Sequence, residues 1–181
     1  MNIVFITIND PVFLPAFFDK FLANANPEDT IRALLVKPYY RNLGAGGMAL
    51  RVLRTFGLRE SLHMALEIAI HTLLDRVIPP KPGGPLHSVR AAFAAHGREA
   101  VPVSGNVNDE SILQRLTEWE TDLIISVGCP QLFKKPLIRL PKKGCLNLHG
   151  APLPRYRGVL PSFWMLKRKI TMNCSPWLLS C

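Results

Sequence analysis

The chain has 181 residues, of which 48% are hydrophobic, and a formal net charge of +9. This length favours one domain around a single core. The longest apolar stretch is interrupted by charged side chains, which argues against a membrane-spanning helix. The amino terminus runs directly into an apolar strand pattern without a basic leader, and the four cysteines lack metal-ligand spacing. We therefore expect a cytoplasmic protein with reduced thiols and no metal site.

Short apolar runs typical of buried strands alternate with segments of helical periodicity. The pattern predicts strands at 2–8, 31–36, 100–103, 122–127 and 144–149. It predicts helices at 12–23, 48–56, 61–78, 88–96 and 110–119, the last of them capped by Asn108 or Asp109. This alternation is typical of a mostly parallel sheet with helices on both faces, a Rossmann-like three-layer α/β/α fold. Ligands of such sheets bind beyond the carboxyl ends of the strands.

The positive charge is concentrated in the last third of the sequence. Residues 1–122 contain 12 Lys or Arg against 13 Asp or Glu, a net charge of −1, and Asp122 is the last acidic residue. The later cations would either attract an anionic ligand or form a solvated face. A nucleic acid such as tRNA is the weaker interpretation, because the cations are not interleaved with aromatic side chains.

The predicted helix at 61–78 carries His63, Glu67, His71 and Asp75 at every fourth position. Such spacing occurs in metal sites, but a solvated stripe is the more common cause. The rest of the helix is so apolar that packing against a partner subunit, for example in a homo-oligomer, is an open alternative.

The predicted strand at 144–149 carries the residues with the clearest chemistry. Alternation along a strand puts Cys145, Asn147 and His149 on one face, with the amide and the imidazole near the carboxyl end. A proline-stiffened loop, 150–158, follows them. Alone, such a pair would usually be structural, but the rigid loop could hold a ligand beside it.

The run Asn147-Leu148-His149-Gly150-Ala151-Pro152-Leu153-Pro154-Arg155-Tyr156-Arg157-Gly158 closely resembles the motif of the formyltransferase family, which includes methionyl-tRNA formyltransferase, glycinamide ribonucleotide transformylase and sugar N-formyltransferases. Residues 122–133 are similar to the family's strand and loop that pack against the pterin ring. The resemblance implies transfer of a formyl group from 10-formyltetrahydrofolate to an amine, with Asn147 and His149 as catalytic residues. The acceptor would be a small molecule, a nucleotide sugar or an aminoacyl-tRNA. The implied folate-binding residues are Gly128, Cys129, Pro130, Gln131, Leu132, Gly150, Ala151, Pro152, Leu153 and Pro154.

The family also uses an Asp downstream of this motif, and the present sequence has no Asp or Glu after Asp122. We therefore expect a truncated formyltransferase domain at 1–170, with a sheet incomplete at its carboxyl-terminal end, and an unrelated tail at 171–181. Asp10, after the first strand, is the better substitute acid, because Asp122 begins its strand at the opposite edge. The alternative is a catalytically inactive remnant that binds folate or another anion. Cys129 is expected to pack rather than to act as a nucleophile.

Overall fold

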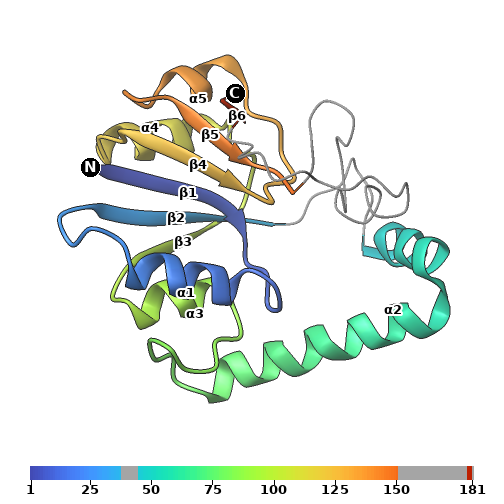
Figure 1. The fold of residues 1–181 in the computed structure, drawn as a ribbon. Coiled ribbons are helices and arrows are strands. Elements are labelled where there is room, and N and C mark those ends of the chain that lie inside the picture. Colours follow the sequence, from blue (N-terminus) through green and yellow to red (C-terminus); the bar gives the residue numbers. More distant parts are fainter. Residues whose placement is uncertain (38–44, 151–178, 181) are drawn as a thin grey trace, which may run out of the picture.

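The computed structural model describes residues 1–37, 45–150 and 179–180. Its elements, shown in Figure 1, are β1 (Asn2–Ile8), α1 (Pro15–Ala23), β2 (Thr30–Val36), α2 (Ala45–Val77), α3 (Val89–Ala95), β3 (Glu99–Val103), α4 (Glu110–Glu118), β4 (Leu123–Val127), α5 (Lys135–Arg139), β5 (Cys145–Leu148) and β6 (Leu179–Ser180). The predicted strands are all present within one or two residues of their expected bounds. The short elements α5 and β6 were not predicted.

One sheet in the order β3-β2-β1-β4-β5-β6 forms the centre of the molecule. The first five strands in this order run parallel, and β6 pairs antiparallel with β5. The prediction of a mostly parallel α/β sheet is therefore confirmed. From β1 the chain proceeds outward through β2 to β3, and then returns to the other side of β1 with β4 and β5. The direction of winding thus reverses between β1 and β4.

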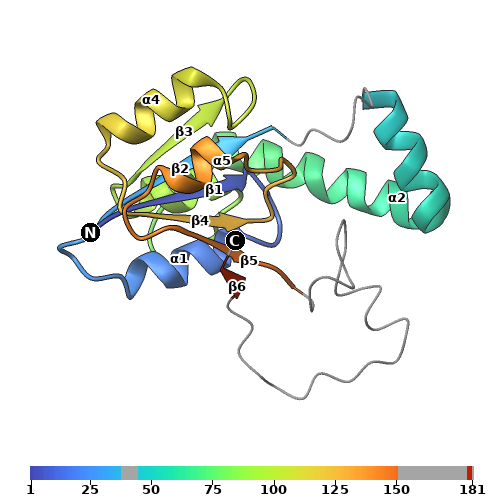
Figure 2. The same ribbon diagram turned by 90° about the horizontal axis from the view of Figure 1, so that it is seen from above.

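Each face of the sheet has its own apolar core, because alternate residues of every strand point to opposite sides. On one face, Phe5 and its neighbours pack against Phe18 of α1 and Phe93 of α3. On the other face, Ile6 and Ile124 pack with Leu116 of α4 and Leu137 of α5. Figures 1 and 2 show these helix pairs on opposite sides of the strands, which gives the expected three layers.

The first turn of α3 is capped by a side chain, whereas that of α4 is not. The Ser88 hydroxyl accepts a hydrogen bond from the Ala91 amide at 2.9 Å and so caps α3. Asp109 is the N-cap residue of α4, as one of the two predicted alternatives, but its side chain makes no cap hydrogen bond. Its carboxylate instead accepts the amide of Asn106 at 2.8 Å. The predicted cap therefore stabilises the preceding loop rather than the helix.

Helix α2 is a long arm of two helices that meet at a kink, in agreement with the two helices predicted at 48–56 and 61–78. It is kinked at Gly57, whose φ of 81° is unfavourable for residues with a side chain. The arm extends away from the sheet layers in both views (Figures 1 and 2). Across the described residues, no helix has the length and apolarity needed to cross a membrane.

Candidate functional site

The reversal of winding between β1 and β4 defines where a ligand site is expected. In open parallel sheets, ligands bind outside the carboxyl ends of the strands at this switch point, where the loops on either side diverge. Here β1 ends at Ile8 and β4 ends at Val127. The residue after β4 is Gly128, which is exposed and adopts a φ of 61°. The loop predicted to bind folate therefore starts at the switch point.

Strand β5 adds the predicted catalytic residues to this edge. Cys145 is buried in the core on the α4 and α5 side of the sheet. Asn147, two residues further along the same strand, lies on the same side and is half-buried. In the strand register it lies opposite Ser126, whose side chain is 7% exposed. His149 is also half-buried and follows directly after the end of β5, so both predicted catalytic residues lie at the carboxyl edge.

The loop after β4 is fixed by hydrogen bonds to the loop after β3. The Gln131 side chain accepts the amide of Val107 at 2.7 Å and donates to the carbonyl of Gly105 at 3.3 Å. Asn108 donates to the carbonyl of Leu132 at 2.9 Å and accepts the amide of Lys134 at 2.6 Å. Both the oxygen and the nitrogen of the Gln131 side chain thus form hydrogen bonds within the protein. The backbone of 128–132 forms a stiff rim. Leu132 of this rim is 89% exposed.

Cys129 in this rim is not an activated nucleophile. Burial raises the pKa of the Cys129 thiol, an effect only partly offset by its contact with Gln131. The thiol donates weakly to the carbonyl of Gln131 at 3.7 Å, and Cys129 packs at the edge of the core that contains Ile6 and Ile124. The neutral thiol therefore supports the loop, as predicted.

The two acids considered as substitutes for the family Asp have other partners. Asp10 lies just beyond β1 at the carboxyl edge, and its Oδ1 accepts the backbone amides of Val12, Phe13 and Leu14. Asp122 lies at the opposite edge and accepts the amide of Asn2 at 2.8 Å. This bond, assisted by Lys142, lowers the pKa of Asp122 despite the opposing effect of desolvation. Both carboxylates thus hold the backbone in place.

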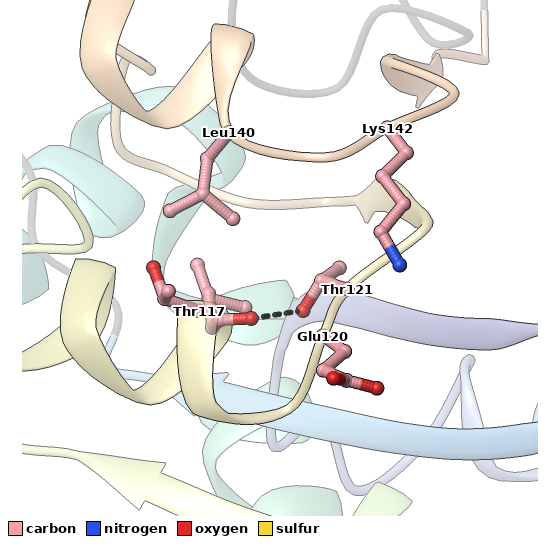
Figure 3. A pocket seen from close by; sticks show the side chains of 6 residues that line it. Thr117, Glu120, Thr121, Leu140 and Lys142 are labelled. Carbon is pink, nitrogen blue, oxygen red and sulfur yellow. Dashed lines mark hydrogen bonds between the residues drawn. The ribbon is translucent and has the colours of Figure 1, made fainter.

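A separate pocket of about 200 Å³ opens at the amino edge of the sheet, between the ends of α4 and α5 (Figure 3). It is lined by Leu116, Thr117, Glu120, Thr121, Leu140 and Lys142. The Thr121 hydroxyl donates to the carbonyl of Leu116 at 2.7 Å and is therefore part of the wall. The full length of β4 separates this pocket from Asn147, so we do not assign it to the candidate site.

Other predicted features lie elsewhere or outside the described residues. Gly150 is described and exposed, whereas Ala151–Pro154 and the rest of the motif lie outside. On α2, the exposed side chains of His63 and Glu67 lie 3.5 Å apart, but His71 lies 3.2 Å from His87, and Asp75 accepts a hydrogen bond from Ser88. The solvated stripe thus covers only half of the predicted positions. Among the described residues, no three His, Cys, Asp or Glu side chains are arranged to hold a metal ion.

Known proteins resemble the part of the chain that forms this edge of the sheet. Residues 80–168 match the family model described as formyl transferase. This segment of the chain is similar to the formyl transferase family. The match begins before α3 and includes β4, β5 and the rim between them, so the family-like part of the chain contains the candidate site.

Two curated relatives are also formyltransferases, and they match over segments of 94 and 114 residues. Methionyl-tRNA formyltransferase of Geobacter metallireducens is 37% identical over 94 residues, which are 51% of this chain and 27% of the relative. The enzyme of the same name from Clostridium beijerinckii is 28% identical over 114 residues, which are 61% of this chain and 37% of the relative. The matches thus span well under half the length of these formyltransferases.

Solved structures agree at the level of the fold. A phosphoribosylglycinamide formyltransferase from Bacillus halodurans superposes with a TM-score of 0.51 at 13% identity, covering 99% of this chain and 80% of that one. A glycinamide ribonucleotide transformylase from Geobacillus kaustophilus gives a TM-score of 0.51 at 14% identity, covering 94% and 69%. The parallel sheet with helices on both faces is therefore shared with formyltransferases of known structure.

Sequence analysis missed the residues that position the site. Ser126 escaped notice because a lone serine in an apolar strand resembles a packing residue, and only the register with Asn147 reveals its location. The mutual support of the loops after β3 and β4 also went unpredicted. An Asn and a Gln in two loops, 23 residues apart in sequence at Asn108 and Gln131, could have suggested such bridging.

Proposed function

We propose that the carboxyl-edge site transfers the formyl group of 10-formyltetrahydrofolate to a substrate amine. The observation that carries this proposal is the location of Asn147 on β5 and of His149 directly after it, beside the switch point and the rim at 128–132. The match of residues 80–168 to the family model supports formyl chemistry, and the switch point supports a site at this edge. The acceptor is a small anionic amine, a nucleotide sugar or an aminoacyl-tRNA.

The proposed step begins with attack of the neutral amine on the formyl carbon. A new C–N bond forms, and negative charge develops on the formyl oxygen. The Asn147 amide and the protonated His149 ring donate hydrogen bonds to this oxygen, where fixed donors avoid the reorganisation that water would need. The bond from the carbon to N10 then breaks as N10 gains a proton from His149, and the attacking nitrogen gives up a proton that restores the protonated ring. The products are the formamide and tetrahydrofolate.

The donor would lie against the rim after β4 and the loop after β5. The pterin of the folate would contact the backbone of Gly128–Leu132, which the bonds of Gln131 and Asn108 keep rigid. A rigid rim reduces the ordering cost of binding. The predicted contacts from Ala151–Pro154 belong to this proposal as well, although those residues lie outside the described part of the chain.

A second candidate is binding without turnover. It is favoured by the placement of the two acids considered as substitutes, since Asp10 supports a backbone turn and Asp122 lies at the far edge. A family carboxylate would hold the histidine charged and oriented, and losing one weakens proton transfer. In that case the folate pocket would remain while transfer would be lost.

The test combines binding and transfer on the full chain. Calorimetric titration with 5-formyltetrahydrofolate, a stable isomer of the donor, measures binding, and a spectroscopic assay with 10-formyltetrahydrofolate and a panel of amines measures transfer. The first candidate predicts both, and Asn147→Ala lowers kcat by about 10²–10³-fold with a smaller change in KM. Binding without transfer supports the second candidate, and absence of binding contradicts both.

The matched control is Thr117→Ala, an exposed position beside the amino-edge pocket. It should leave both folate binding and transfer unchanged. An equal loss in Asn147→Ala and Thr117→Ala would indicate a general effect on folding instead of a role at the carboxyl edge.

A further inference from the structure

The outward face of α2 carries a row of exposed apolar side chains after the kink. Leu58, Leu62, Leu66 and Leu73 are each 60–63% exposed, and Val77 is 71% exposed. In the core of the sheet, by contrast, residues such as Phe18 and Leu116 are fully buried. A contiguous exposed apolar surface of this kind is typical of an interaction site.

The other face of the same helix already has its partners. His71 contacts His87, and Asp75 accepts hydrogen bonds from Ser88 at 2.7 Å and Arg90 at 3.2 Å. These contacts join the last turns of α2 to the residues just before α3 and to its first turn. The orientation of the helix is thereby fixed, with its leucines directed away from the body.

The exposed face has the spacing of a helix-pairing seam. Leu62, Leu66, Ala69 and Leu73 follow one another at intervals of four, three and four residues, the heptad pattern that packs one helix against another. Arg59 and Arg76 continue the same pattern by three residues at either end, and both are exposed. The seam is therefore apolar in the middle and positive at both ends.

Acidic residues of the arm lie off this seam. Glu67 pairs with His63 on the flank, and Asp75 faces the body. The positions immediately beside the apolar part of the seam include Ala65, Ile70 and Thr72, which carry no charge. The two terminal arginines thus determine which charges a partner must present.

The charges on α2 disfavour three potential binding partners of its seam: a second copy, residues 151–178 of this chain, and a membrane surface. A second copy would place Arg59 beside Arg59 in a parallel pair, or opposite Arg76 in an antiparallel pair, and like charges in such positions are destabilising. Residues 151–178 of this chain contain no Asp or Glu and would add further cations. A membrane-surface helix usually carries Lys and Arg along its polar face, where α2 instead has Glu60 and Glu67.

We infer that α2 is the docking site for an amphipathic helix of another protein, whose apolar seam is bounded at both ends by Asp or Glu. Its apolar side chains would interdigitate with the seam Leu62, Leu66, Ala69 and Leu73, as in other helix-pairing interfaces. Its terminal carboxylates would pair with Arg59 and Arg76, which fixes register and excludes cationic partners. This interaction is independent of the proposed formyl transfer.

The test uses two synthetic helical peptides of about three heptads with the same leucine seam. One peptide has Glu at both ends of the seam, and the other has Lys. Fluorescence anisotropy with the full chain should show at least about tenfold tighter binding of the Glu peptide, with the preference reduced by salt. The double variant Arg59→Glu with Arg76→Glu should reverse the preference.

The matched control is Arg51→Glu with Arg54→Glu, the same charge change before the kink and off the seam. It should keep the preference for the Glu peptide. Equal binding of both peptides, or no binding of either, would overturn the inference. A concentration-dependent dimer in sedimentation that blocks the peptide, or binding to phosphatidylcholine–phosphatidylglycerol vesicles through the same leucines without any peptide preference, would also overturn it.

Discussion

Helices α1 and α2 are both rich in apolar residues, yet the structure uses them in opposite ways. Helix α1 buries Phe18 and Leu22 against the sheet, where the ring of Phe18 meets Phe5 edge-on with centroids 5.2 Å apart. Helix α2 directs its leucines to solvent. The apolar pattern of a helix predicts that one face will be covered. What covers it depends on contacts that the pattern alone does not specify.

Core truncation should produce the largest difference between the two helices. Phe18→Ala removes a fully buried ring and should lower the free energy of unfolding by about 3–5 kcal/mol. Leu66→Ala, at a position that is 60% exposed, should change it by no more than about 0.5 kcal/mol. Urea denaturation of both variants measures these values. Similar losses would mean that the leucine face of α2 is covered within this chain.

Removing the attachment of α2 should have an intermediate effect. In Asp75→Ala, Ser88 and Arg90 lose a shared carboxylate, and the free energy of opening α2 should fall by about 1.5–3 kcal/mol. Hydrogen exchange should therefore accelerate in the last turns of α2 while β1 stays protected. His63→Ala, an exposed position on the same helix, is the control. Faster exchange in β1 as well would show that the arm and the sheet unfold together.

The smallest effect is expected at the amino edge of the sheet. The backbone amide of Asn2 holds the pKa of Asp122 below its ordinary value of 3.8. The ionised form therefore adds stability at neutral pH, and this contribution disappears as pH falls through the lowered folded-state pKa. Asp122→Asn should melt slightly below the parent chain at pH 7 and together with it near pH 2. A difference that persists at acid pH would contradict this origin.

The sheet could be predicted because β1, β2 and β4 are short, predominantly apolar runs, which are typical of strands buried on both faces. The two helices of α2 could also be predicted, since Gly57 interrupts the helical pattern and the structure is kinked there. Tertiary contacts at the far end, from Asp75 to Ser88 and Arg90, depend on distances that no local pattern encodes.

The candidate site was predicted in part. Alternation along β5 indicated that Asn147 faces the same side as Cys145, and the structure agrees. The predicted role of the Gln131 side chain in folate binding stays a prediction, although two backbone groups already occupy that amide. Periodicity gives the direction of a side chain on a strand, but it does not reveal which loop a polar side chain bridges.

Nuclear magnetic resonance titration of the full chain with 5-formyltetrahydrofolate tests the central claim most directly, because it distinguishes the two edges of the sheet. We predict shifts for the Asn147 side-chain amide, the His149 ring and the backbone amide of Gly128. The amides of Glu120, Thr121 and Lys142 at the amino-edge pocket should stay unchanged. Shifts confined to that pocket, or none at Asn147 and His149, would contradict the account.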